Sequence, residues 1–255
     1  MSRTLSDMRS FDEAESIALF AARIEHTLLR PEATPSDIER LCAEAAQFKF
    51  ATVCVNSAYT KLAAEWVRAT GVVVTTTVAF PFGASNTPAK LREAEQAIAD
   101  GASELDMVIA IGWLRAGCDD LVFNEIEEMR SLTAGKTLKV ILETALLTDV
   151  EKIRGAGLAS DAGADFVKTS TGFARSGAEP NDVRLLRRAL PPSVRIKAAG
   201  GIRSYAQART LIAAGADRLG VSHGVRLMEE LAALKPPRTQ VDPLTGRADN
   251  TKVSE

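Results

Sequence analysis

The sequence is poor in the residue types that build metal sites and disulfide frameworks. Its 255 residues include two histidines and three cysteines. Cys42, Cys54 and Cys118 are scattered along the chain without metal-ligand spacing, which is typical of a protein in a reducing cytoplasm. The two histidines have no carboxylate cluster at ligand spacing beside them, so nothing in the sequence indicates a metal site.

A strong charge of one sign and long apolar runs are also absent. The net charge at pH 7 is -2, which argues against broad electrostatic attraction to nucleic acid or to an anionic membrane but is compatible with a local phosphate pocket. No apolar run approaches the roughly 20 residues that are needed to cross a bilayer. The first residues, MSRTLSDMRSFDEAES, lack the apolar segment of a signal peptide. We therefore expect a soluble cytoplasmic protein that binds neither nucleic acid nor membrane.

Short apolar runs alternate with amphipathic helical stretches, which is typical of a parallel α/β fold. Eight such units in one chain predict a single (β/α)8 barrel, a TIM barrel, over residues 1–234, with an extra N-terminal helix near residues 11–20. A polar tail is expected at 235–255. A doubly wound open sheet stays an alternative, because periodicity does not report closure, although no GxGxxG motif follows the first strand. The predicted strands are 22–29, 52–56, 72–78, 104–110, 139–144, 165–170, 194–199 and 217–221.

Two lysines follow apolar runs that are typical of buried strands. Lys168 lies in AGADFVKTSTGF and Lys197 in VRIKAAGGIRS, and small residues and a loop follow each of them. Burial and a second nearby cation both favour the neutral form of an amine, which is the nucleophile of Schiff-base chemistry. Strand-end lysines can instead reach solvent while their stems are buried. Two of them at the same point of consecutive β-α units favour the catalytic interpretation.

The ends of the other strands carry further polar residues, and active sites of (β/α)8 barrels lie at the carboxyl ends of the strands. Asp106 lies in the apolar run LDMVIAIG, where an ionised carboxylate needs a partner, and either lysine could serve. Such a pair could be purely structural. A carboxylate with two lysines is also a complete set for carbonyl chemistry, because one amine attacks and the other groups move protons. The remaining strand-end candidates are Glu25, His26, Cys54, Asn56, Glu143, Thr144, Thr169 and Ser170.

Glycine-containing segments predict a pocket for an anion. AAGGI follows the seventh predicted strand, and GVSHG follows the eighth. Loops at these two places of a (β/α)8 enzyme usually hold a phosphate through backbone N–H groups and a helix amino terminus. The segment after the sixth strand could add a donor. The residues that we expect to bind the phosphate are Thr171, Gly172, Gly200, Gly201, Ser222 and His223.

Several motifs together resemble those of the deoxyribose-phosphate aldolase family. The pairing of KTSTG with KAAGG is the most specific of these signals, and the resemblance extends over about residues 22–228. The segments that carry it are IEHTLLRPEAT, ATVCVNSAYT, FPFGASNTPAKLREAEQAIADGASELDMVIAIG, LKVILETALLTD, AGADFVKTSTGF, IKAAGGIRS and GADRLGVSHGV.

The resemblance implies a class I aldolase on a (β/α)8 barrel. Such an enzyme reversibly cleaves 2-deoxy-D-ribose 5-phosphate to acetaldehyde and D-glyceraldehyde 3-phosphate, without a metal or organic cofactor. By resemblance, Lys168 is the Schiff-base lysine, Lys197 is the second lysine that perturbs it, and Asp106 is the acid/base carboxylate. The residues that fall where the family holds the substrate phosphate are Gly172, Gly200, Gly201 and Ser222.

Departures from the family pattern gather near the substrate loops. Glu25 stands where the family usually has Asp, and the segments 174–177 and 222–223 also differ. Two alternatives therefore stay open: a Schiff-base aldolase of a different phosphorylated or acidic sugar, and a barrel that binds a sugar phosphate without catalysis. A phosphate-binding isomerase is weaker, because it would use carboxylates rather than lysines. The sequence leaves a homodimer or a higher homo-oligomer open.

Overall fold

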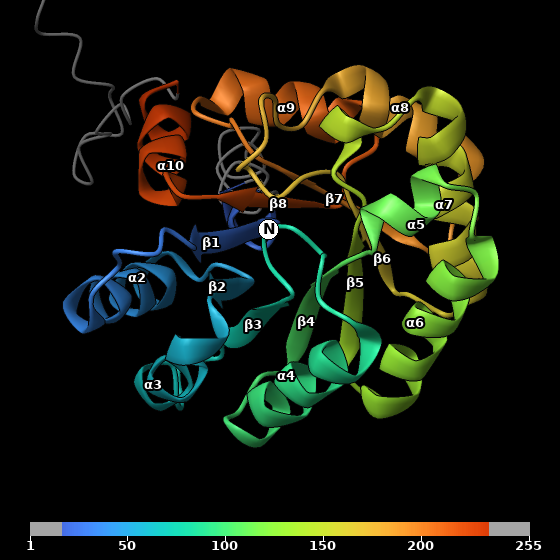
Figure 1. Cartoon of the computed structure of the whole chain (residues 1–255). Helices are drawn as coiled ribbons and strands as arrows, with labels where there is room; N and C mark the ends of the chain where they lie inside the picture. Colours follow the sequence, from blue (N-terminus) through green and yellow to red (C-terminus); the bar gives the residue numbers. More distant parts are fainter. Residues whose placement is uncertain (1–16, 235–255) are drawn as a thin grey trace, which may run out of the picture.

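Eight parallel strands form a closed barrel in the computed structural model, which describes residues 17–234 (Figure 1). The ring closes where β1 pairs with β8, with Ile24 opposite Leu219. Closure confirms the predicted barrel and excludes the doubly wound open sheet. The strands are β1 (Ile24–Leu28), β2 (Thr52–Val55), β3 (Val73–Val78), β4 (Glu104–Val108), β5 (Thr137–Ile141), β6 (Phe166–Lys168), β7 (Arg195–Ala199) and β8 (Arg218–Val221).

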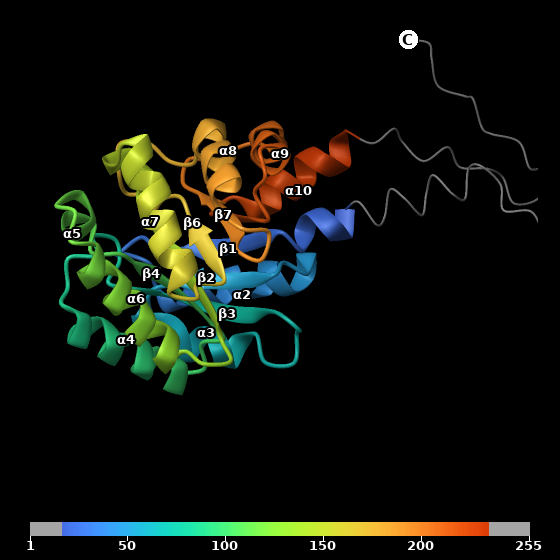
Figure 2. The same ribbon diagram turned by 90° about the vertical axis from the view of Figure 1, so that its right-hand side faces the viewer.

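Helices pack along the outside of the strands (Figure 2). Several begin with a capping residue that the sequence supplies. Thr34 and Thr148 each form a capping box with an acidic residue three positions later. The helices are α2 (Pro35–Phe48), α3 (Thr60–Trp66), α4 (Thr87–Ala99), α5 (Ile111–Arg115), α6 (Asp119–Leu132), α7 (Asp149–Asp161), α8 (Pro180–Ala189), α9 (Tyr205–Ala213) and α10 (Gly224–Ala233), with short 3-10 turns η1 (Ser57–Tyr59) and η2 (Thr144–Leu146).

The extra helix and the tail lie at the limits of the described residues. Residues 17–21 are helical, and the rest of the helix expected near 11–20 lies outside the described part of the chain, as does the tail expected at 235–255. Within residues 17–234, no helix combines the length and the apolar character that crossing a membrane requires.

The strand register brings the predicted catalytic residues to neighbouring positions. Lys168 on β6 is paired with Lys197 on β7. Asp106 on β4 is paired with Lys139 on β5. Because directly paired residues of adjacent strands point to the same face of the sheet, the two side chains of each pair lie side by side in the barrel.

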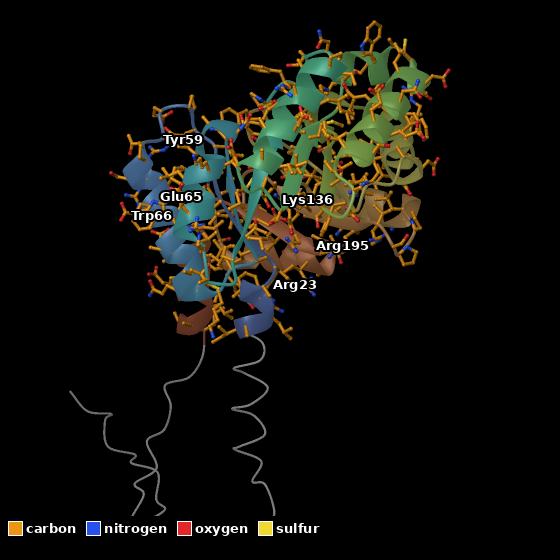
Figure 3. All side chains as sticks on the ribbon, turned by 90° about the horizontal axis from the view of Figure 1, so that it is seen from below. Arg23, Tyr59, Glu65, Trp66, Lys136 and Arg195 are labelled. Carbon is orange, nitrogen blue, oxygen red and sulfur yellow. The ribbon has the colours of Figure 1, made fainter. Side chains whose placement is uncertain are left out.

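Basic side chains gather at the end of the barrel where the strands begin, which is its amino-terminal end. Arg23 precedes β1, Lys136 precedes β5, and Arg195 is the first residue of β7 (Figure 3). The Arg195 guanidinium lies 4.0 Å from the centre of the Phe166 ring. Phe166 is fully buried, so this ring helps to fill the lower part of the barrel. In (β/α)8 proteins the residues at this end contribute to stability, and the active site lies at the carboxyl ends of the strands.

Candidate active site

The interior of the barrel contains charged side chains that are almost completely removed from solvent. Burying a charge is costly unless the group is paired and hydrogen-bonded, and here every member has an oppositely charged neighbour. The cations are Lys139, Lys168, Lys197 and the half-buried Arg218, and the anions are Glu25, Glu104 and Asp106.

Asp106 is shared by three lysines. Its Oδ2 atom accepts hydrogen bonds from Lys168 Nζ at 2.8 Å and from Lys197 Nζ at 2.7 Å. Its Oδ1 atom accepts one from Lys139 Nζ at 2.9 Å. Burial alone would raise the pKa of Asp106, but the three ammonium groups outweigh it and hold this pKa well below its usual range. The carboxylate is therefore an anion at neutral pH.

Lys197 has two carboxylate partners. It donates to Asp106 and to Glu25 Oε2, and its side chain is fully buried. Burial would lower the pKa of Lys197, but the attraction of Asp106 and Glu25 outweighs it and raises this pKa. Lys197 thus stays a cation beside the same carboxylate oxygen that Lys168 contacts.

A second tier of charges lies next to this group. Lys139 Nζ lies 2.6 Å from Glu104 Oε2 and 3.3 Å from Glu25 Oε2. Arg218 Nη1 lies 3.1 Å from Glu104 Oε2 and 3.3 Å from Glu25 Oε1. Burial would raise the pKa of Glu25, but Lys139, Lys197 and Arg218 lower it to about 2. These contacts link the lysines at the carboxyl ends of the strands to the middle of the barrel.

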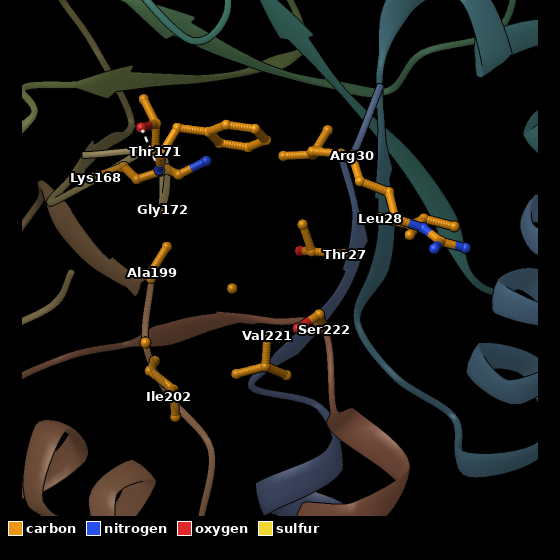
Figure 4. Close-up of a pocket in the computed structure, with 15 residues that line it drawn as sticks. Thr27, Leu28, Arg30, Lys168, Thr171, Gly172, Ala199, Ile202, Val221 and Ser222 are labelled. Carbon is orange, nitrogen blue, oxygen red and sulfur yellow. Dashed lines mark hydrogen bonds between the residues drawn. The ribbon is translucent and has the colours of Figure 1, made fainter. Parts of the chain in front are cut away.

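A cavity of about 280 Å³ opens above the charged group at the carboxyl ends of the strands. Lys168 lines it, whereas the more deeply placed Asp106 and Lys197 do not. Figure 4 shows Lys168 and Thr171 on one side of the cavity, with Thr27 and Ser222 across from them. Of the three lysines that contact Asp106, Lys168 is therefore the one that a ligand in this cavity can reach.

Glycines form much of the cavity wall between β6 and β8. Gly200 has a φ of +91°, and a Cβ atom there would lie 3.0 Å from Gly177 Cα and 3.1 Å from Gly172 Cα. A side chain at position 200 would therefore be strained and would push these two segments apart. The close approach leaves backbone N–H groups at the wall, which suits an anionic ligand.

Comparison with known proteins assigns the chain to a family. The family model described as DeoC/LacD family aldolase matches residues 15–227. A deoxyribose-phosphate aldolase of Coprothermobacter proteolyticus is 48% identical over 208 residues, which cover 82% of this chain and 95% of that protein. One of Thermococcus gammatolerans is 50% identical over 213 residues, or 82% of this chain and 95% of that protein. The chain belongs to the DeoC/LacD aldolase family.

A solved structure from the same group agrees with this assignment. The deoxyribose phosphate aldolase of Aeropyrum pernix, whose structure is described as tetrameric, superposes with a TM-score of 0.81 at 32% identity. The match covers 91% of this chain and 100% of that one. Family membership and the closed barrel therefore rest on independent comparisons of sequence and of structure.

Most residues expected at the phosphate site of this aldolase line the cavity. They are Thr171, Gly172, Gly200, Gly201 and Ser222. Thr171, however, donates both its backbone N–H, at 3.2 Å, and its hydroxyl proton to Glu143. His223 does not line the cavity, and its Nδ1 atom lies 2.9 Å from Ser222 Oγ. The sequence placed His223 in the anion pocket, whereas in the structure it is exposed and lies beside Ser222 outside the cavity lining.

Two arginines near the substrate loops also point elsewhere. Arg175 donates to the backbone oxygen of Ala145 at 3.2 Å and does not line the cavity. Arg30 lies at the cavity rim, but its guanidinium points away in Figure 4 and lies 3.0 Å from Asp37. The cavity therefore offers an anion mainly backbone groups and a hydroxyl.

Sequence reasoning missed Lys139, Glu104 and Arg218, and it left Glu25 without a role. A signal for Lys139 was present, because a lysine between Leu138 and Val140 interrupts an apolar run much as Asp106 does. The predicted strand began at Lys139, whereas β5 begins at Thr137, so Lys139 is an interior residue of the strand. Within residues 17–234, no group of three or more His, Cys, Asp or Glu side chains could hold a metal ion.

Proposed function

We propose that this protein is a class I aldolase that reversibly cleaves 2-deoxy-D-ribose 5-phosphate to acetaldehyde and D-glyceraldehyde 3-phosphate. The observation that carries the proposal is the contact of Lys168 and Lys197 with one oxygen of Asp106, below a cavity that only Lys168 lines among these three residues. A barrel that merely binds a sugar phosphate has no need of a lysine held against a shared proton acceptor.

The chemistry needs a nucleophilic amine and a route for protons. Lys168 gives a proton to Asp106 and attacks the substrate aldehyde at C1 to form a carbinolamine. The carbinolamine hydroxyl takes the proton back from Asp106 and leaves as water, which gives an iminium ion. The C2–C3 bond then breaks, its electron pair flows into the iminium group to give an enamine, and the C3 hydroxyl gives up its proton. Protonation of the enamine at carbon and hydrolysis release acetaldehyde. Asp106 carries these protons, and Lys197 stays beside it as a fixed cation.

The glycine-lined wall provides the place for the substrate phosphate. We assign it to Gly172, Gly200, Gly201 and Ser222, which line the cavity together with Lys168. Neither Arg175 nor Arg30 points into the cavity. We therefore expect backbone N–H groups to form most of the hydrogen bonds to the phosphate oxygens. This arrangement supports a phosphate ester over a free acidic sugar, since a tetrahedral anion accepts several backbone donors at once.

Borohydride trapping tests the proposal. Reduction in the presence of acetaldehyde should leave a stable adduct on the peptide that contains Lys168. Lys168→Leu should abolish trapping, whereas Lys61→Leu on the exposed face of α3 should leave it unchanged. Full trapping in the Lys168→Leu protein would remove this residue from its role. Lys197→Leu should still fold but should lose most of its turnover.

Comparison of substrates separates the alternatives. Deoxyribose 5-phosphate should be cleaved far faster than deoxyribose, and ribose 5-phosphate should be a poor substrate. If another phosphorylated or acidic sugar is preferred, the mechanism stands and the substrate assignment is wrong. Absence of an adduct together with tight binding of the phosphate ester would favour a binding protein.

We also propose a cytoplasmic homo-oligomer. Two of the three cysteines are buried as free thiols, which suits a reducing compartment. A related structure is described as tetrameric, and exposed Phe82 and Trp113 border one apolar groove beside α5 in this chain. Light scattering during size-exclusion chromatography would measure the oligomeric state. A monomer at micromolar concentration would contradict the proposal.

A further inference from the structure

Glu143, just after β5, combines a strained backbone with a buried carboxylate. Its φ of 58° and ψ of 66° lie in the left-handed region, which glycine adopts at no cost and which other residues rarely adopt. Its side chain is 3% exposed. Among the residues that the structure describes, none is a hydrogen-bond partner of its Oε1 atom. Strain and an unpaired buried polar atom both lower stability, and such features gather at functional sites.

The other carboxylate oxygen of Glu143 controls a residue of the cavity wall. Oε2 accepts the backbone N–H of Thr171 at 3.2 Å and also the Thr171 hydroxyl proton. The Thr171 oxygen in turn accepts the backbone N–H of Phe173 at 3.1 Å. A threonine hydroxyl has one proton and two lone pairs. Its proton is therefore committed to Glu143, and one lone pair remains on a residue that lines the cavity.

This arrangement gives the two sides of the cavity opposite hydrogen-bonding character. Thr171 can accept a hydrogen bond from a ligand but has no donor left for one. A phosphate or carboxylate oxygen would be repelled there, so the anion belongs on the wall formed by Gly200, Gly201 and Ser222. A ligand hydroxyl, which can donate, fits beside Thr171. Lys168 and Thr171 line the same cavity, so one ligand can contact both residues.

The chemistry decides which substrate hydroxyl fits, and this step rests on the proposed function. The oxygen at C3 becomes a carbonyl when the C–C bond breaks and can then no longer donate. A fixed acceptor would oppose it. The neighbouring hydroxyl at C4 keeps its proton through the whole reaction. We propose that Glu143 is a positioning residue that keeps Thr171 as a hydrogen-bond acceptor for this spectator hydroxyl.

Two acceptor aldehydes test the proposal in the synthetic direction, with acetaldehyde as the donor. D-glyceraldehyde 3-phosphate carries the spectator hydroxyl, and 3-oxopropyl phosphate lacks it. The measured quantity is the ratio of kcat/KM for the two aldehydes. The wild-type protein should prefer the hydroxylated aldehyde, and Glu143→Ala, Glu143→Gly and Thr171→Val should each lower the ratio roughly tenfold, the value of one lost hydrogen bond of this kind. Glu143→Gln and Thr171→Ser, which keep an acceptor and a hydroxyl, should retain most of the preference.

Controls separate positioning from folding. Glu143→Gly relieves the left-handed strain, so it should unfold at a higher urea concentration than Glu143→Ala while having the same low ratio. Ala69→Gly relieves the same kind of strain, at φ 67°, outside the cavity and should leave the ratio unchanged. If the Glu143 variants slow both aldehydes by the same factor, Glu143 serves the fold and the inference is overturned. If Glu143→Ala does not fold, Glu143→Gly and Thr171→Val decide, because a retained preference in either overturns the inference.

A failure of this inference differs from a failure of the proposed function. A wild-type protein that forms no borohydride adduct with acetaldehyde lacks the proposed activity altogether. A wild-type protein that forms the adduct and turns over both aldehydes, but whose ratio does not depend on Glu143, keeps the activity and refutes only the role of Glu143.

Discussion

Replacing Asp106 with asparagine should destabilise the protein by an amount that depends strongly on pH. The change keeps the shape of the side chain but removes one of three buried carboxylates that face four cations. Loss of one partner from a buried ion pair costs roughly 3–5 kcal/mol. The variant can limit this cost by folding with one of its lysines uncharged.

The cost of an uncharged lysine gives the expected magnitude. A lysine with an unfolded-state pKa of about 10.4 costs about 1.4 kcal/mol to deprotonate for each pH unit below that value. The difference in unfolding free energy between wild type and Asp106→Asn should therefore be about 4–5 kcal/mol at pH 7, about 3 kcal/mol at pH 8 and below about 1 kcal/mol at pH 10.

The sign follows from proton binding in the two states. In the variant, the folded state binds fewer protons than the unfolded state, so its stability rises with pH up to about 10.4. In the wild-type protein the pKa of Lys197 is raised, so its contribution is fully present below the unfolded pKa and is lost only as the pH rises further. The two curves should therefore converge between pH 7 and pH 10.

Urea unfolding at a series of pH values, followed by circular dichroism, measures this difference. Asp161→Asn, on an exposed residue at the end of α7, is the matched control and should change stability by less than about 0.5 kcal/mol at every pH. A difference for Asp106→Asn that is constant with pH, or no larger than that of the control, would refute the account of the buried charges.

Three further outcomes follow from other parts of the structure. The pKa of Glu25 is lowered from 4.5 to about 2, so its contribution to stability is present above about pH 4.5 and is lost as the pH falls through about 2; Glu25→Gln should flatten an acid-unfolding curve in that window. Gly157→Ala in α7 should stabilise the folded protein by about 0.5–1 kcal/mol, because an added Cβ meets nothing within 4 Å. Gly155→Ala should destabilise it, because the added Cβ would lie 2.9 Å from Leu114 Cδ2. The urea midpoints of the two variants measure both effects. Thr148→Ala removes the capping box of α7 and should cost about 1 kcal/mol in the same assay, and an unchanged midpoint would contradict it.

The sequence predicted most of the strands near their observed places, because each is a short apolar run bounded by turn residues. The fifth strand shows where this fails. It was expected at 139–144 and lies at Thr137–Ile141, so Lys139 is an interior residue of the strand rather than its first one. Strands of a parallel barrel are buried on both faces and do not alternate cleanly between polar and apolar residues. Their ends are therefore hard to place from the pattern alone.

The sequence predicted that three charged residues would lie together in the candidate site, but it did not predict the other charged groups around them. Lys168, Lys197 and Asp106 each interrupt an apolar run, and that local signal marks a buried charge. The partners of these charges are remote in sequence, since Lys197 meets Glu25 across 172 positions. His223 and Arg175 show the converse, because both lie on the expected loops and yet neither lines the cavity.

The chain by itself determined an alternating α/β pattern, lysines at two neighbouring strand ends and glycines at the loops that follow. Each of these depends on a short stretch of residues. Tertiary structure decided that the sheet closes, that three lysines share one carboxylate and that Glu143 holds Thr171. Those contacts depend on the stagger of eight strands around a ring, and the position of a side chain within that ring is fixed by all of the strands together.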